Sequence, residues 1–326
     1  MQKRVYLLLI LAGILSAMLI QCNRETPRFS FEEQGREAPA FSADSAGKFV
    51  EDQVNLGPRA PNSGGHRLAK EYLEETLRRY AGSRNVFVQS FREQGYGEEL
   101  ELYNMIASFN PESIDRILLG AHWDTRPRAE KDPDRPGEPI PGADDGGSGV
   151  AILLELARIF SENPPPVGVD IIFFDGEDYG ESGDLDNYFL GSRYWSNHPP
   201  VPGYQPRFGI LLDMVGGENA VFPKEGYSVR IAPSLVEALW EMGAEMGYGN
   251  YFLDEEGALI SDDHVIIERL TGIRMINIIH HRRAENGSVE FPPYWHTHRD
   301  TMDIIDRQTL QAVGDLMVEL IYNRIN

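Results

Sequence analysis

Short apolar segments that stop at acidic or histidine residues recur along this chain, and they constrain its fold more than any other feature. Residues 114–121 are followed by His122, residues 167–174 by an acidic stretch, and residues 207–212 by Asp213. Helical patterns lie between them, including the strongly apolar run 150–160. Strands that alternate with helices predict an α/β fold, a mostly parallel twisted sheet with helices on both faces.

The length and composition favour one domain. Hydrophobic residues make up 41% of the 326 residues and charged residues 25%, which is typical of a folded chain and argues against general disorder. A chain of this length buries most of its apolar surface without disulfides. The sequence has no internal repeat, so we predict a single catalytic domain over residues 41–326.

The charge balance excludes one class of partner. The chain has 30 Lys and Arg against 51 Asp and Glu, a formal net charge of −21. Nucleic-acid binding requires a basic face to neutralise phosphates, and the sequence offers none. We therefore expect no nucleic-acid partner.

The N-terminus predicts export. Residues 1–22 begin with basic residues, continue with an apolar run over 5–20 and reach Cys22, the only cysteine. This segment resembles a bacterial signal with a lipobox, although Gln21 replaces the usual small residue before the cysteine. An uncleaved anchor helix is the alternative. Either way the body lies outside the cytoplasm, and we expect it at the periplasmic face of a bacterial membrane, lipid-anchored at Cys22. Residues 23–40 are polar and predict a flexible tether.

The acidic strand ends predict a metal site. Ligands of open α/β sheets bind beyond the carboxyl ends of the strands. Carboxylates gathered there repel one another unless a cation compensates them, and carboxylate combined with imidazole suits zinc. No HExxH motif is present, which excludes a thermolysin-type site. The candidate residues are His122, Asp124, Asp145, Glu177, Asp178, Asp213, the cluster 262–264 and His296.

Six motifs, taken together and in this order, carry a resemblance to a known family. They are HWDTRP (122–127), GADD (142–145), FFDGED (173–178), LLD (211–213), DDH (262–264) and FPPYWHT (291–297). The chain resembles the zinc aminopeptidase superfamily and, within it, the glutaminyl-peptide cyclotransferases (glutaminyl cyclases), in particular bacterial enzymes of the animal type. The resemblance runs from about residue 57 to the C-terminus.

The resemblance implies a ligand set and a catalytic group. Asp145, Asp178 and His296 match the three ligands of a single zinc ion, with Asp178 standing where the animal enzymes have a glutamate that is one methylene longer. Glu177 matches the catalytic acid/base. Two acids, Asp213 and Asp263, match partners in its hydrogen-bond network.

The resemblance also implies an aromatic substrate pocket. Trp295 matches one tryptophan of its wall. A second tryptophan has no evident counterpart, and Tyr179, Tyr188 and Phe189 are the candidates to replace it.

The implied reaction is the cyclisation of N-terminal glutamine in peptides or proteins to pyroglutamate, with release of ammonia. The attacking amine is already tethered to its target, so zinc as a Lewis acid and a proton-shuttling Glu177 suffice. One alternative is a two-metal aminopeptidase, in which His122 and Asp213 bind a second metal that Asp145 shares, and Asp124 orients His122. Another is a non-catalytic surface lipoprotein on the same fold.

Overall fold

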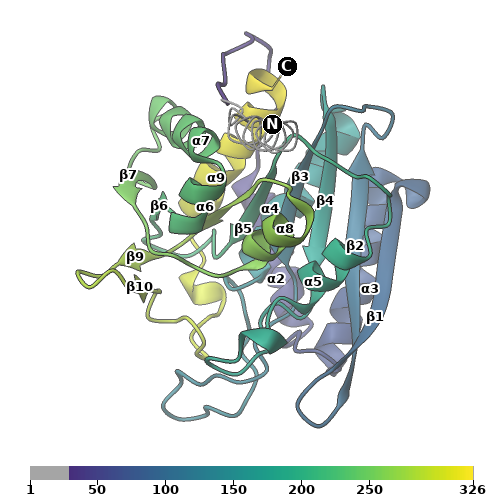
Figure 1. Cartoon of the computed structure of the whole chain (residues 1–326), viewed down its shortest axis with the longest axis vertical. Coiled ribbons are helices and arrows are strands. Elements are labelled where there is room, and N and C mark those ends of the chain that lie inside the picture. Colours follow the sequence, from purple (N-terminus) through teal and green to yellow (C-terminus); the bar gives the residue numbers. More distant parts are fainter. Residues whose placement is uncertain (1–28, 326) are drawn as a thin grey trace, which may run out of the picture.

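A computed structural model describes residues 29–325 of the chain (Figure 1). The predicted signal segment, Cys22 and the first part of the predicted tether lie outside the described residues. Within residues 29–325, no helix has both the length and the apolar character needed to cross a membrane.

The described residues alternate between helices and strands for most of their length. The helices are α2 (Ala43–Asn55), α3 (Gly64–Ala81), α4 (Gly147–Glu162), α5 (Leu190–Asn197), α6 (Gly226–Ile231), α7 (Pro233–Glu245), α8 (Asp263–Thr271) and α9 (Arg307–Glu319). The strands are β1 (Val86–Gln94), β2 (Glu99–Phe109), β3 (Arg116–His122), β4 (Gly168–Phe174), β5 (Gly209–Asp213), β6 (Phe222–Lys224), β7 (Phe252–Glu256), β8 (Met275–Ile279), β9 (Arg282–Arg283) and β10 (Val289–Glu290). Four single turns complete the list: η1 (Ser83–Asn85), η2 (Leu185–Asn187), η3 (Met302–Ile304) and η4 (Leu320–Arg324).

The main sheet has six strands in the order β1-β2-β4-β3-β5-β8. Strands β4, β3, β5 and β8 pair in parallel, whereas β2 is antiparallel to both of its neighbours. The prediction of a mostly parallel sheet in one α/β domain is confirmed.

Helices cover both faces of this sheet, as predicted. In Figure 1, α5 and α8 lie in front of the strands and α2 and α4 lie behind them. Successive side chains of each strand point to opposite faces of the sheet. Leu118 packs in the cluster that holds Trp195 of α5 and Ile267 of α8. Its neighbour Leu119 packs in the larger cluster on the α4 face. This two-sided burial explains why the central strands are apolar runs without polar alternation.

The parallel register brings the carboxyl ends of the strands to one edge of the sheet. His122 of β3 lies opposite Phe174 of β4, and Asp213 of β5 lies opposite Ile279 of β8. The loops that follow these strands therefore share one end of the domain.

The described part of the predicted tether, residues 29–40, contains no helix or strand but lies against the body of the domain. The rings of Phe29 and Phe31 contact Phe208 with centroid distances of 5.4 and 6.1 Å. The backbone N–H of Gln34 donates to the carbonyl oxygen of Asn323.

Candidate metal centre

One group of ligand-type side chains consists of Asp145, Asp178 and His296, which the sequence placed on three separate loops. Their ligand atoms lie within 4.8 Å of one another. His296 Nε2 is 3.4 Å from Asp178 Oδ2 and 3.7 Å from Asp145 Oδ2. All three residues are buried. The three predicted ligands are thus brought together.

The donor set of this group fits a cation. Asp145 Oδ2 and Asp178 Oδ2 are buried and have no hydrogen-bond partner among the described residues. Burial lowers the pKa of His296, but Asp178, Glu130 and Asp145 outweigh it and raise this pKa to about 9. The carboxylates around His296 therefore favour a positive charge at this place. Two unpaired carboxylate oxygens and an imidazole nitrogen are the ligands that zinc takes.

A buried arginine and a glutamate hold these ligands from behind. Arg126 Nη1 donates to Asp178 Oδ1 at 2.7 Å, and its other nitrogens pair with Glu130 at 2.6 Å. Glu130 Oε1 in turn lies 3.0 Å from His296 Nδ1. A carboxylate on Nδ1 orients the ring so that Nε2 faces the other ligands. Sequence reasoning missed Glu130, because it lies in a loop rich in proline and charge without any periodic pattern.

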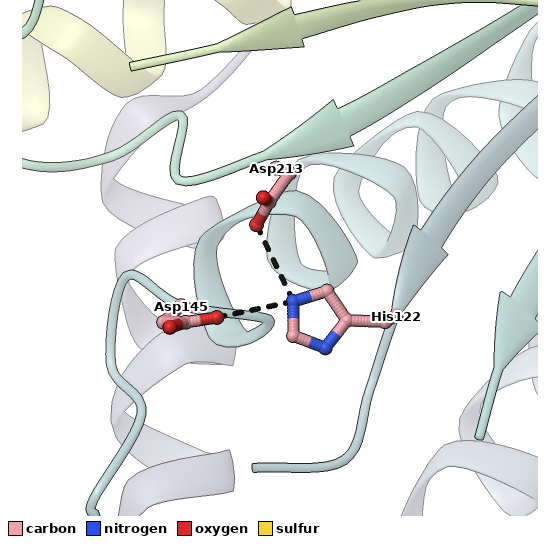
Figure 2. Close-up of side chains that lie close together, drawn as sticks. All are labelled: His122, Asp145 and Asp213. Atoms are coloured by element: carbon pink, nitrogen blue, oxygen red, sulfur yellow. Dashed lines mark hydrogen bonds and ion pairs between the residues drawn. The ribbon is translucent and has the colours of Figure 1, made fainter. Parts of the chain in front are cut away.

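A second group shares Asp145 and consists of His122, Asp145 and Asp213 (Figure 2). His122 Nε2 is 3.2 Å from Asp145 Oδ1 and 3.3 Å from Asp213 Oδ1. Because this one ring nitrogen contacts both carboxylates directly, a single N–H of His122 faces Asp145 and Asp213 together. Burial raises the pKa of Asp213 to about 6, although His122 opposes the rise.

Glycine at position 146 lets the Asp145 loop approach the end of β3. Gly146 has φ +78°, and a Cβ there would lie 2.8 Å from the carbonyl oxygen of Asp124. Any other residue would strain the turn and push His122 away.

Two buried carboxylates fix the backbone of the ligand loops. Asp124 accepts the N–H groups of Glu177 and Asp178 at 3.0 and 3.2 Å. Asp300 accepts the N–H groups of Asp144 and Asp145 at 2.7 and 3.1 Å. Asp124 also lies 3.6 Å from His122 Nδ1, beyond hydrogen-bond distance, so its predicted orienting role stays a prediction. Nothing in the sequence marked Asp300.

Glu177 stands beside the ligand group without a strong partner. Its side chain is 13% exposed, and the nearest cationic atom is His122 Nδ1 at 3.9 Å. Burial, with help from the charges of Asp178, Asp262 and Asp263, raises its pKa well above the usual range. A carboxyl group with a raised pKa in such a cavity is a candidate for taking up and releasing a proton during a reaction.

The two other predicted acids lie at different depths. Asp213 lines the cavity beside Glu177, and so does Asp262 of the candidate cluster 262–264. Asp263 is fully buried behind them, where its Oδ1 accepts the hydroxyl of Ser192 at 2.5 Å. Within residues 29–325, no hydrogen bond joins Glu177 to Asp213 or Asp263, so the predicted network stays a prediction.

These groups open into a cavity of about 200 Å³ with a largely apolar wall. Trp295 forms part of the wall, as predicted, and its ring stacks on His296 with centroids 3.6 Å apart. Of the three candidates for a second aromatic, Tyr188 and Phe189 line the cavity. Tyr179 is buried outside it, where its ring stacks on Tyr96.

Comparisons with known proteins agree on one family. The sequence profile of peptidase family M28 matches residues 104–321. A Zn-dependent exopeptidase from Parabacteroides distasonis is 44% identical, with a TM-score of 0.84 over 88% of this chain and 100% of that one. A glutaminyl cyclase from Bacteroides thetaiotaomicron is 46% identical, with a TM-score of 0.83 over 89% and 100%. The glutaminyl-peptide cyclotransferase of Drosophila melanogaster is 27% identical over 317 residues, 87% of this chain and 84% of that protein.

Proposed function

Because this chain belongs to peptidase family M28 and, within it, to the glutaminyl cyclases, we propose that it converts N-terminal glutamine of peptides or proteins to pyroglutamate and ammonia. Asp145, Asp178 and His296 would hold one zinc ion. When bound, zinc supplies a Lewis acid for the side-chain carbonyl of the substrate.

Glu177 carries the proton that the reaction must move. The α-amine nitrogen forms a bond to the side-chain amide carbon, and the bond from that carbon to the amide nitrogen breaks. Glu177 takes one proton from the amine and delivers it to the departing nitrogen, which leaves as ammonia. The amine and the amide belong to one residue, so the remaining task is to fold that residue into the reactive geometry.

The cavity wall suits this task. Phe189, Trp295, Ile260 and Phe291 give the cavity apolar sides, while its floor holds Glu177 and the ligand group. Apolar walls exclude water, which the cyclisation does not need and which would hydrolyse a polarised amide.

The observation that carries the proposal is the pair of carboxylate oxygens on Asp145 and Asp178 that have no hydrogen-bond partner among the described residues and lie beside the half-buried Glu177. Mass spectrometry of the purified protein with a Gln-initiated and a Leu-initiated peptide tests it. We expect a loss of ~17 Da from the Gln peptide, abolished by a chelator and restored by zinc. An unchanged Gln peptide would refute the proposal.

A two-metal aminopeptidase is the second candidate function, favoured by the group of His122, Asp145 and Asp213. Its ligand atoms lie within 4.8 Å of one another, as those of the first group do, and the distances of 3.2 and 3.3 Å from His122 Nε2 to the two carboxylates suit a direct N–H contact as well as a shared ion. The first group, in contrast, leaves two oxygens unpaired. Free leucine from the Leu peptide, with two zinc ions per chain, would favour the aminopeptidase.

We also propose that the protein is exported and held at the periplasmic face of a bacterial membrane by a lipid on Cys22. The basic start, the apolar run over 5–20 and the lone cysteine after it support this location. Cys22→Ala should move the protein from the membrane fraction to the soluble fraction. A variant that stays with the membrane would indicate an uncleaved anchor helix instead.

A further inference from the structure

The end of the domain opposite the metal centre carries exposed apolar loops. We call it the proline edge: residues 111–114 before β3, Pro164 and Pro166 before β4, and residues 199–202 before β5. Ile114 is 98% exposed and Val201 is 57% exposed. The exposed prolines of this edge are Pro111, Pro164, Pro166, Pro199, Pro200 and Pro202.

Two of these loops are neighbours in space. Pro111 lies with Pro200 and Val201 around one apolar cavity, which has Trp195 in its wall. The Asn110 side chain also donates to the carbonyl oxygen of Pro165, which ties the third loop to the first. The proline edge is therefore one surface.

The chain arriving from the N-terminus reaches the domain at this same end. Phe29, the first described residue, packs its ring on Phe208, directly before β5. The carbonyl oxygen of Phe208 accepts the N–H of Leu118 at the start of β3, four residues after Ile114. Figure 1 shows the start of the described chain and the loops that precede the strands at the upper end, with the long loop after β3 at the lower end.

The length of the intervening chain fixes how far this end can stand from the anchor. Six residues separate Cys22 from Phe29, which makes seven Cα-to-Cα steps. At 3.3–3.6 Å per residue they span at most ~25 Å. The metal centre lies beyond the far ends of the strands, and the seven residues of β3 alone place it ~20 Å farther away.

We propose that the proline edge is the membrane-facing surface of this protein and rests on the lipid bilayer through Ile114 and Val201. This inference rests on the proposed anchor at Cys22. It assigns an orientation that the anchor alone does not give: the cavity opens away from the lipid, toward periplasmic peptides and protein N-termini.

The chemistry of the edge suits a lipid headgroup layer. Apolar side chains gain from leaving water, and proline has no backbone N–H that would need a partner there. Beside the loops, Arg207 Nη1 lies 3.1 Å from Asp115 Oδ2, and within the edge the exposed Glu112 has no basic partner among the described residues, so the edge carries no excess of positive charge. We therefore expect contact with zwitterionic lipid, without a requirement for anionic lipid.

A single label on the full-length, lipidated chain tests the orientation. Lipidation occupies Cys22, the only cysteine, so Ile114→Cys offers one free thiol for a bimane fluorophore. Val201→Cys is the second test position. Leu185→Cys is the matched control, because Leu185 is an apolar side chain of similar exposure (55%) at the cavity rim. The proteins are placed on phosphatidylcholine vesicles that contain nitroxide-labelled lipid.

The nitroxide lipid should quench most of the fluorescence at positions 114 and 201 and little at position 185. Equal quenching at all three positions, or none at 114 and 201, would overturn the orientation. Efficient crosslinking of two chains through position 114, without quenching, would assign the edge to a second copy and likewise overturn it.

Flotation of the protein with vesicles tests the proposed anchor at Cys22 independently of the proposed orientation. If Cys22→Ala floats as well as wild type, the anchor proposal fails, while the label still reports which edge meets lipid. A wild-type chain that does not float would overturn both.

Discussion

Replacing Glu177 by Gln separates the proposed proton transfer from every structural role of this side chain. The substitution keeps the shape and removes the ability to accept a proton. Within residues 29–325 the side-chain oxygens of Glu177 receive no hydrogen bond, and the contact to His122 spans 3.9 Å. The variant therefore loses no strong interaction of the folded state.

The expected loss is confined to turnover. A positioned general acid or base contributes about 10²–10⁴ in rate, which corresponds to about 2.7–5.5 kcal/mol of transition-state stabilisation. The free energy of unfolding should stay the same or rise, because a neutral amide is less costly to bury than a carboxylate. Zinc content should stay at the wild-type value, because the amide leaves the ligands of Asp145, Asp178 and His296 in place.

Three measurements on one preparation decide the matter: cyclisation rate, bound zinc and urea unfolding. Glu181→Gln is the matched control, since it makes the same chemical change at an exposed position four residues away. Its rate should equal that of wild type. A Glu177→Gln variant within tenfold of the wild-type rate would refute the proton-transfer role, and a loss of zinc or stability together with rate would show a structural role instead.

Three further predictions concern the ligands, their support and the acid stability of the fold. His296→Ala should lose zinc on dialysis whereas His122→Ala should keep it, as atomic emission would show; equal loss from both would place His122 in the ligand set. Asp300→Asn turns an accepting oxygen into an amide donor that faces a backbone N–H. We therefore expect the free energy of unfolding, measured in urea, to fall by about 1–3 kcal/mol and zinc binding to weaken about 10–100-fold. Unchanged values would contradict the role of Asp300 in supporting Asp145. Burial raises the pKa of Glu225, but an imidazole and backbone N–H groups outweigh burial and lower this pKa from 4.5 to about 2. The ionised Glu225 therefore contributes its full share of the free energy of unfolding above pH 4.5 and loses it as the pH falls toward 2. In the Glu225→Gln variant the free energy of unfolding should fall less steeply with acidification than in wild type, and equal slopes would refute this.

The periodic elements of the fold were predictable from the sequence. The apolar run 150–160 lies within α4, and α2 carries a local signal at its start, where the Ser42 hydroxyl caps it by accepting the N–H of Ser45. The predicted strand over 167–174 corresponds to β4, buried at every position. Burial on one face or on both leaves a pattern along the chain, and capping residues mark the ends.

Short helices without such patterns were not predicted. The candidate cluster 262–264 does not lie at a strand end, because Asp262 caps α8, whose nine residues run from Asp263 to Thr271 ahead of β8. Helix α5 begins after Phe189, a non-glycine residue with φ +59° and no capping side chain. Helices of two turns owe their stability to tertiary packing rather than to local signals.

The residues of the candidate site also differ in how far they could be predicted from the sequence. Ligands at strand ends, such as Asp213, follow from the topology, because parallel strands end at one edge. His296 lies in a loop without regular structure; the residue pattern gave it only as one candidate among several, and the resemblance gave it the role of a ligand. Glu130 and Asp300 act through contacts with residues more than 150 positions away, and such contacts leave no trace in one sequence.

The shorter ligand at position 178 shows how the backbone compensates for side-chain length. An aspartate reaches one methylene less far than the glutamate of the animal enzymes, yet Asp178 Oδ2 lies 3.4 Å from His296 Nε2. The turn at Gly176, with φ +68°, and the hydrogen bond from the Asp178 N–H to Asp124 set the main chain at this point. Arg126 then fixes one carboxylate oxygen and leaves the other free to bind a cation. The position of the Asp178 carboxylate is thus set by the loop and its buried supports as well as by the length of the side chain.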